Sequence, residues 1–128
     1  MALAIHLPYY ATGLRADQLG EALEGLTADL LRHGAHDVRL YRSKEDAYRF
    51  RQVIVVGSKA DWTRIWNSEF FIDFRTTKIA LYQKPLAYEM YEVISSGLAP
   101  DPETQDAPVQ NEGAASAPVV GSSPGLSA

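Results

Sequence analysis

The composition of the chain changes abruptly near Gly97, and this change limits what can fold. Every aromatic residue and every Lys and Arg among the 128 residues lies within residues 1–97. Residues 98–128 are rich in Ala, Pro, Ser and Gly, and they contain no aromatic or basic residue. Such a segment cannot bury enough apolar surface to offset the entropy lost on ordering it. The sequence therefore predicts one compact domain over residues 1–97, followed by a disordered, acidic tail over residues 98–128.

Charge and composition exclude several classes of protein. Residues 1–97 carry 12 basic and 12 acidic side chains, so the domain lacks the net basic field of a nucleic-acid scaffold. The chain has no cysteine, which excludes disulfides and thiolate metal sites. The apolar start Met1–Pro8 has no cationic region and is too short for a signal peptide or a membrane span. We expect a cytoplasmic protein that binds neither nucleic acid nor membrane.

Hydrophobic periodicity predicts six main elements in the order β-α-β-β-α-β. Alternation predicts a first strand from Ala2 to Leu7, and helical spacing predicts a helix from Leu14 to His33 with Gly34 as its left-handed cap. A hairpin of strands Asp37–Arg42 and Tyr48–Val56 follows. Ser58 caps the second helix, which Asn67-Ser68 interrupts before a short continuation over Glu69–Phe74. The last strand runs from about Ile79 to Ile94 and is bent by Pro85. This order predicts a ferredoxin-like α+β fold, a four-stranded antiparallel sheet with two helices on one face.

A single sheet of this kind leaves its second face uncovered. The last strand carries many aromatic and aliphatic side chains, namely Tyr88, Met90, Tyr91, Val93 and Ile94, so we expect its uncovered face to be an interface and not a solvated surface. The same face of an identical subunit, related by a two-fold axis, is the simplest cover. The sequence therefore predicts a homodimer.

Two stretches of sequence resemble a known superfamily. The run Trp62-x3-Trp66-x2-Glu69-Phe70-x3-Phe74, and the later Lys84-Pro85 followed by Tyr88–Val93, look like those of the dimeric α/β-barrel proteins. Members include antibiotic-biosynthesis monooxygenase-like proteins, muconolactone isomerase-like enzymes and haem-handling proteins. The resemblance covers residues 1–96 and implies two sheets that close into a barrel between subunits. Because the matching motifs are packing motifs, it implies no particular reaction.

The hairpin supplies most of the candidate site. If residues 43–47 form its loop, Arg39 lies opposite Arg51 and Tyr41 opposite Arg49. These four side chains share the face away from the helices, which His6 also occupies. Like charges across strands repel, so the Arg39–Arg51 pair needs an anion, a carboxylate such as Asp37 or Glu89, or water. Either the arginines lie in solvent on an edge hairpin, or Arg39, Arg49 and Arg51 bind a small anionic or phenolic molecule.

Candidate chemistry follows from the same residues. His6 and Tyr41 are the candidate proton-transfer groups, and Arg39 or Arg51 would hold a developing oxyanion. Trp66 either anchors its helix to the sheet or contacts a bound ring. The sequence predicts no cofactor and no metal site. Two functions stay open: a small-molecule-binding protein for an anionic or aromatic metabolite, or a cofactor-independent monooxygenase-like or isomerase-like enzyme acting on an aromatic or polyketide-type enol.

Overall fold

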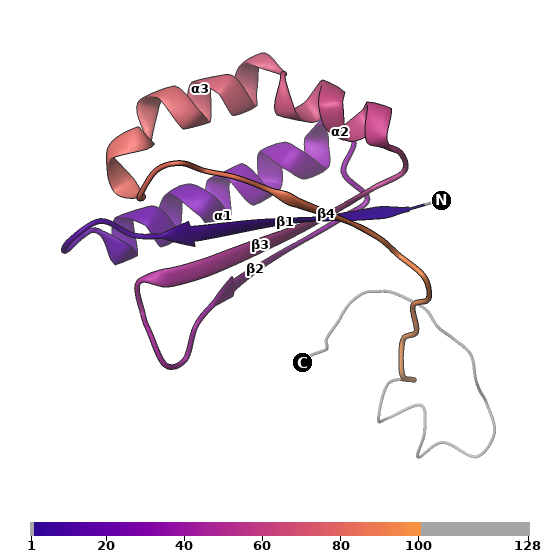
Figure 1. Cartoon of the computed structure of the whole chain (residues 1–128), viewed down its shortest axis with the longest axis horizontal. Helices are drawn as coiled ribbons and strands as arrows, with labels where there is room; N and C mark the ends of the chain where they lie inside the picture. Colours follow the sequence, from indigo (N-terminus) through magenta and orange to yellow (C-terminus); the bar gives the residue numbers. More distant parts are fainter. Residues whose placement is uncertain (1, 101–128) are drawn as a thin grey trace. The chain divides into compact units, whose positions relative to one another are not determined.

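A computed structural model describes residues 2–100 of the chain (Figure 1). Its elements, in chain order, are β1 (Leu3–Tyr10), α1 (Ala16–Arg32), β2 (Asp37–Arg42), β3 (Arg49–Val56), α2 (Lys59–Trp66), α3 (Glu69–Thr77), a short 3-10 turn η1 (Ile79–Leu81) and β4 (Glu89–Glu92). The first compact unit ends at Val93, and residues 94–100 contain no helix or strand. The predicted disordered tail lies outside the described residues, except for residues 98–100.

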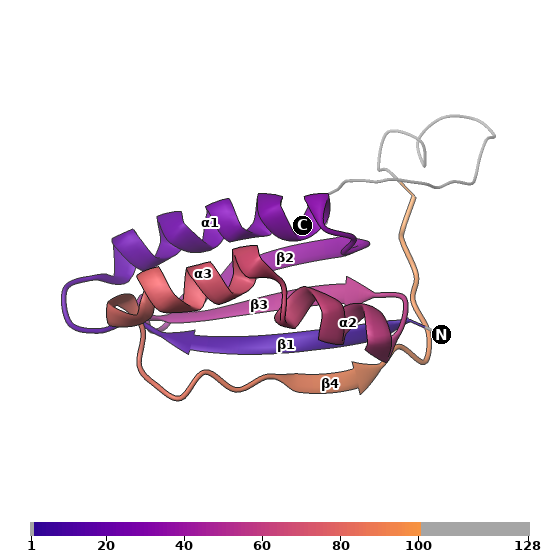
Figure 2. The same ribbon diagram turned by 90° about the horizontal axis from the view of Figure 1, so that it is seen from above.

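The sheet has the strand order β2-β3-β1-β4, and every neighbouring pair is antiparallel. All three α-helices lie on the same side of the sheet (Figure 1), with α1 nearest β2 and the α2–α3 pair nearer β1 (Figure 2). This arrangement confirms the predicted ferredoxin-like fold.

Strand alternation divides the sheet into two faces. Along β1, Ile5, Leu7 and Tyr9 are buried against the helices, while His6 and Tyr10 project from the other face. Helix α1 supplies the facing apolar stripe, made of Leu19, Leu23, Leu26 and Leu30. All of the core therefore lies on the helix side, and the opposite face has no cover from the described residues of the first unit.

The helix ends confirm most of the sequence analysis. Gly34 has φ of +109°, and Ser58 Oγ accepts a hydrogen bond of 3.1 Å from Asp61 N–H at the start of α2. Asn67-Ser68 separates α2 from α3, as predicted. The expected start of α1 at Leu14 was wrong by two residues: Leu14 has φ of +63°, which is incompatible with a right-handed helix.

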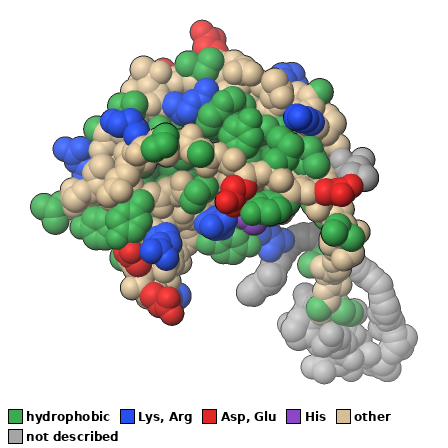
Figure 3. All heavy atoms as spheres, viewed as in Figure 1, with side chains coloured by type: hydrophobic (Ala, Val, Ile, Leu, Met, Phe, Trp, Pro, Cys, Tyr) green, Lys and Arg blue, Asp and Glu red, His purple; other side chains and the backbone are tan. Residues whose placement is uncertain are grey.

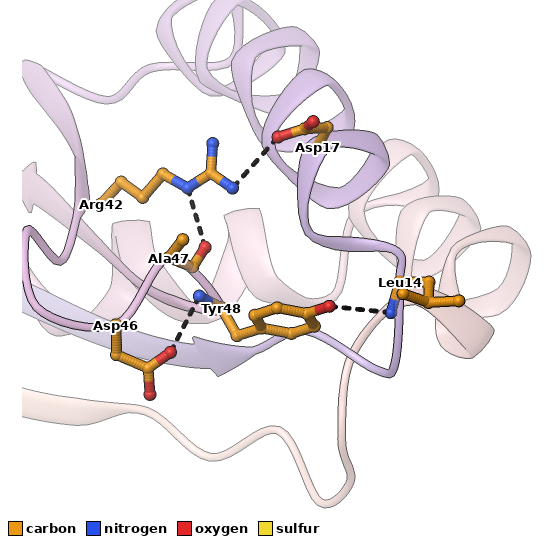
Figure 4. Close-up of polar contacts among 6 residues, drawn as sticks. All are labelled: Leu14, Asp17, Arg42, Asp46, Ala47 and Tyr48. Carbon is orange, nitrogen blue, oxygen red and sulfur yellow. Dashed lines mark hydrogen bonds and ion pairs between the residues drawn. The ribbon is translucent and has the colours of Figure 1, made fainter.

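The hairpin register differs from the prediction. Arg39 lies opposite Val53, and Tyr41 lies opposite Arg51, so the register is shifted by two residues. The loop is longer than residues 43–47, because Ser43 N–H bonds to Arg49 C=O, and Tyr48 falls within the loop. Figure 4 shows why: Asp46 accepts from Tyr48 N–H at 3.0 Å, and the Tyr48 hydroxyl accepts from Leu14 N–H at 3.0 Å. A shift of two keeps each side chain on its predicted face.

The last strand was predicted too long. β4 spans only Glu89–Glu92, and Ile79–Leu81 is a 3-10 turn. The reason lies in β1. Its even-numbered residues direct their backbone groups toward β4, since Ala2 C=O and Tyr10 C=O accept from Val93 N–H and Gln83 N–H. Pro8 belongs to the same series and has no N–H, so the ladder stops at the His6–Glu89 pair.

Candidate functional site

The five strand residues singled out from the sequence lie on one face of the sheet. His6 of β1, Tyr41 of β2 and three arginines all project away from the helices; the arginines are Arg39, Arg49 and Arg51. Side chains of both charges gather on this side of the molecule (Figure 3). We call this surface the open sheet face.

Each arginine of the open sheet face has a carboxylate partner. Arg39 pairs with Asp37 at 3.3 Å, and Arg51 with Glu89 at 3.9 Å. Arg49 pairs with Asp46 at 3.9 Å. Asp37 and Glu89 are the two carboxylates that the sequence analysis offered as partners. The charges of the face are thereby balanced without a bound anion.

His6 is held by contacts from two neighbouring strands. Arg51 Nη1 donates to His6 Nδ1 at 3.1 Å, and the Tyr91 ring meets the imidazole edge-on at 4.8 Å. Because guanidinium can only donate, Nδ1 is the acceptor, and the neutral ring carries its proton on Nε2. Partial burial and the charge of Arg51 lower the His6 pKa, and Glu89 opposes part of this shift. The acceptor nitrogen of His6 is thus occupied by Arg51.

The lowered pKa of His6 predicts a pH dependence of stability. The unfolded chain takes up this proton near pH 6.5, whereas the folded chain takes it up only at lower pH, so the unfolded state binds more protons between the two values. The free energy of unfolding should therefore fall as pH decreases from 6.5 through that window. In His6→Gln, this component should vanish from urea titrations repeated at several pH values. An unchanged pH profile in the variant would contradict the assignment.

Tyr41 lies in register with Arg51, and its side chain is half exposed. Among the described residues, its hydroxyl forms no hydrogen bond. The Tyr91 hydroxyl, in contrast, donates to Glu89 at 2.9 Å, and this bond raises the Tyr91 pKa. The open sheet face is therefore a paired polar network flanked by half-buried Val53 and Val55.

Trp66 lies in a different place, on the helix side of the sheet. Its ring is 5.6 Å from Trp62, 5.2 Å from Phe71 and 5.0 Å from Tyr88, measured between centroids. The guanidinium of Arg75 lies over the Trp66 ring at 3.8 Å. We call Trp62, Trp66, Phe71, Arg75 and Tyr88 the tryptophan cluster. The structure thus separates Trp66 from the other five residues with which the sequence analysis grouped it.

Arg75 is the most unusual group of the tryptophan cluster. Its Nη2 donates to Trp66 C=O at 2.9 Å, but Nη1 is buried and has no hydrogen-bond partner among the described residues. Trp62 Nε1 is also buried and has no hydrogen-bond partner among the described residues. Burial lowers the pKa of Arg75, and Tyr82 and Tyr9 partly oppose that shift. An unsatisfied buried donor costs about 1–3 kcal/mol, and more when it is charged, so two of them in one cluster require an explanation.

A second buried polar group lies nearby and is fully paired. The Tyr9 hydroxyl donates to Gln52 Oε1 at 3.2 Å, and Gln52 Nε2 donates to Thr27 Oγ1 at 3.2 Å. Burial raises the pKa of Tyr9, and the ring of Tyr82 lies edge-on to it at 5.7 Å. Tyr9 is therefore neutral at physiological pH. The contrast with Arg75 shows that burial alone does not leave polar groups unpaired in this core.

Sequence reasoning missed Arg75 and Tyr88 as members of a site. Arg75 follows Trp66 by nine residues across the break between α2 and α3, so a single helical period cannot place the two together. Tyr88 precedes β4 in an irregular segment, which gives no periodic signal.

Among residues 2–100, the helices are too short or too polar to cross a bilayer, and no group of three His, Asp or Glu side chains could hold a metal ion.

No protein-family model matches the chain, and no curated protein matches it in sequence. Solved structures do match it. PA3566 from Pseudomonas aeruginosa is 22% identical over 72% of this chain and 94% of that protein, with a TM-score of 0.64. A Nitrosomonas europaea protein assigned as an antibiotic biosynthesis monooxygenase is 13% identical over 75% and 94%, with a TM-score of 0.67. SnoaB, a cofactor-independent oxygenase from Streptomyces nogalater, is 12% identical over 74% and 95%, with a TM-score of 0.66.

These identities show a shared fold. The chain has the ferredoxin-like fold that these solved structures share, and the predicted fold is confirmed. Since one fold supports unrelated functions, function has to be argued from the open sheet face and the tryptophan cluster.

Proposed function

We propose that this protein is a homodimer that binds a planar aromatic molecule bearing an anionic or enolic oxygen, and that the tryptophan cluster is the binding site. The observation that carries the proposal is the buried, unpaired Nη1 of Arg75. An oxygen of the ligand would accept from this nitrogen, and a bound ring would pack against Trp62 and Trp66.

The chemical class of the ligand follows from the surroundings of Arg75. The surroundings are aromatic, because the ring centroids of Trp66 and Phe71 lie 3.8 Å and 5.0 Å from the guanidinium carbon. No carboxylate pairs with Arg75 among the described residues, in contrast to the arginines of the open sheet face. A negative oxygen on an apolar ring supplies both the missing acceptor and the missing charge.

The chain offers a direct assay for this proposal, because its two tryptophans both belong to the cluster. We expect 2-hydroxy-1,4-naphthoquinone, an anion at pH 7.5, to quench the tryptophan fluorescence saturably. Neutral 1,4-naphthoquinone should bind at least tenfold more weakly. Arg75→Met should weaken binding of the anion about tenfold or more and leave the neutral probe unaffected, since a hydrogen bond to a charged group contributes about 1.5–3 kcal/mol.

Arg64→Met is the matched control, because Arg64 is an exposed arginine of α2 that pairs with Asp61. It should bind both probes like the unmodified protein. Equal binding of the two probes, or equal effects of the two substitutions, would contradict the proposal that the cluster binds an anion selectively.

An enzyme is the second candidate, favoured by the shared fold with SnoaB and by Tyr82 and Tyr9, which partly oppose the lowering of the Arg75 pKa. The reaction would convert an activated ring CH2 and O2 into a ring C=O and water, with Arg75 stabilising the enolate that reacts with O2. Oxygen uptake that depends on such a substrate and is lost in Arg75→Met would support this reading. Binding without oxygen uptake supports the non-catalytic function.

The homodimer is proposed from the open sheet face. It carries half-buried Val53 and Val55 together with Tyr41 and Tyr91, each about half exposed, and its charges are already paired. A face of this kind can be buried in a two-fold interface without leaving an unpaired charge there. In this arrangement His6, Tyr41 and the three arginines belong to the interface. Their roles in proton transfer and anion binding stay predictions, as do the cytoplasmic location and the disordered tail.

A further inference from the structure

The segment before β4 leaves the sheet at one place. Between the Ala11–Tyr82 bridge and the His6–Glu89 pair, β1 has residues 7–10 while the other strand has residues 83–88. The second segment is therefore two residues longer than the ladder needs, and it bulges from the edge of β1 (Figure 2). Residues 84–88 form no backbone hydrogen bond within the described part of the chain. A segment with so few backbone bonds opens at low free-energy cost.

Tyr88 closes this segment onto the tryptophan cluster. Its ring meets Trp62 edge-on at 5.2 Å and Trp66 edge-on at 5.0 Å, so a single ring covers both tryptophans. The Tyr88 side chain is nevertheless 38% exposed, and its hydroxyl forms no hydrogen bond among the described residues. Trp62 beneath it is wholly buried. The Tyr88 side chain is held by ring packing, and its segment is otherwise attached to the core through half-buried Leu86.

We propose that Tyr88 is an internal plug, which occupies the place of the ligand ring and must swing away with residues 84–88 before an aromatic molecule can bind. This inference rests on the proposed function of the tryptophan cluster and adds its entrance, at the edge of β1 where Pro8 ends the ladder. The ligand ring takes over the contacts of the Tyr88 ring with Trp62 and Trp66. The Tyr88 ring lacks the anionic oxygen that Arg75 Nη1 requires, so the correct ligand competes successfully with the plug.

The plug makes a prediction opposite in sign to that of an ordinary contact residue. Tyr88→Ala should tighten binding of 2-hydroxy-1,4-naphthoquinone at least fivefold, because the unfavourable opening step is removed. Association should speed up and lose any plateau at high probe concentration in stopped-flow quenching of tryptophan fluorescence. Tyr88→Phe keeps the ring and loses only the unbonded hydroxyl, so it should retain the plug and show none of this tightening.

A second measurement keeps the test valid without the probe. Acrylamide should quench the tryptophans at least twofold more efficiently in Tyr88→Ala than in Tyr88→Phe, at a temperature where circular dichroism shows both folded. Weaker or unchanged probe binding in Tyr88→Ala would overturn the plug while leaving the proposed function intact. If the unmodified protein and Tyr88→Ala both fail to bind the probe, the proposed function falls and the plug with it. Binding that appears only in Tyr88→Ala would support both.

Discussion

Replacing Trp62 by alanine is expected to lower the free energy of unfolding by about 3–5 kcal/mol, the range for a large aromatic residue deleted from a core. The side chain is wholly buried and contacts Trp66, Phe71 and Tyr88 through its ring. Its removal leaves a cavity on the helix side of the sheet that neighbouring side chains can fill only in part. Stabilities of small domains are about 5–15 kcal/mol, so a large share of the total is lost.

Urea denaturation followed by circular dichroism measures this change, since fluorescence would itself be altered by the substitution. Leu14→Ala is the control: Leu14 is 94% exposed, and its truncation should change stability by no more than about 0.5 kcal/mol. A loss below about 1 kcal/mol in Trp62→Ala would mean that the helix pair α2–α3 is not packed as described.

The strands and helices were predictable where one period dominates. Alternation in Leu3–Tyr10 and the leucine stripe of α1 each have a single apolar face, so position along the chain determines which side is buried. The cap at Ser58 was predictable for a similar reason, because its bond to Asp61 N–H is local. Sequence reasoning therefore recovered the order of elements and the face on which the residues of β1, β2 and β3 lie.

Prediction failed where two distant segments decide the outcome. The hairpin register depends on the Tyr48 hydroxyl reaching Leu14, and a contact over that separation has no local pattern. The length of β4 depends on Pro8, which belongs to the neighbouring strand and acts through a missing N–H. Both errors changed pairing. The prediction for the last strand was also wrong about one face: Tyr88 and Met90 lie on the helix side, because Met90 pairs with the buried Ile5 and the Tyr88 ring packs on Trp62.

The residues of the candidate sites also differ in whether a local pattern or a contact between distant segments places them. His6, Arg39 and Arg51 were found because strand parity places them together, and their carboxylate partners came from the same reasoning. Arg75 has no such signal, since it joins Trp66 only after the chain turns at Asn67-Ser68. Its importance comes from the Trp66 ring beneath its guanidinium and from its own unpaired Nη1, and both exist only in three dimensions.

Replacing Val53 by aspartate should convert the proposed dimer into a monomer, with at least a hundredfold weaker association. Val53 is at the centre of the open sheet face, between Arg39 of β2 and His6 of β1. In a free subunit, the new carboxylate would lie beside Arg39 and remain in water, so the subunit should still fold. In the dimer the new carboxylate would be buried without a partner, because Arg39 and Arg51 are already paired to Asp37 and Glu89. An unpaired buried charge costs several kcal/mol.

Sedimentation velocity at micromolar concentrations measures this change directly. Leu31→Asp is the matched control, since Leu31 is a half-exposed apolar residue of α1 on the opposite side of the sheet. It should leave the sedimentation coefficient of the dimer unchanged. A folded monomer in the unmodified protein would reject the dimer, and a dimer that survives Val53→Asp would place its interface elsewhere.

Because the tryptophan cluster lies within one subunit, the Val53→Asp monomer should still bind the anionic probe. This result would separate subunit association from ligand binding.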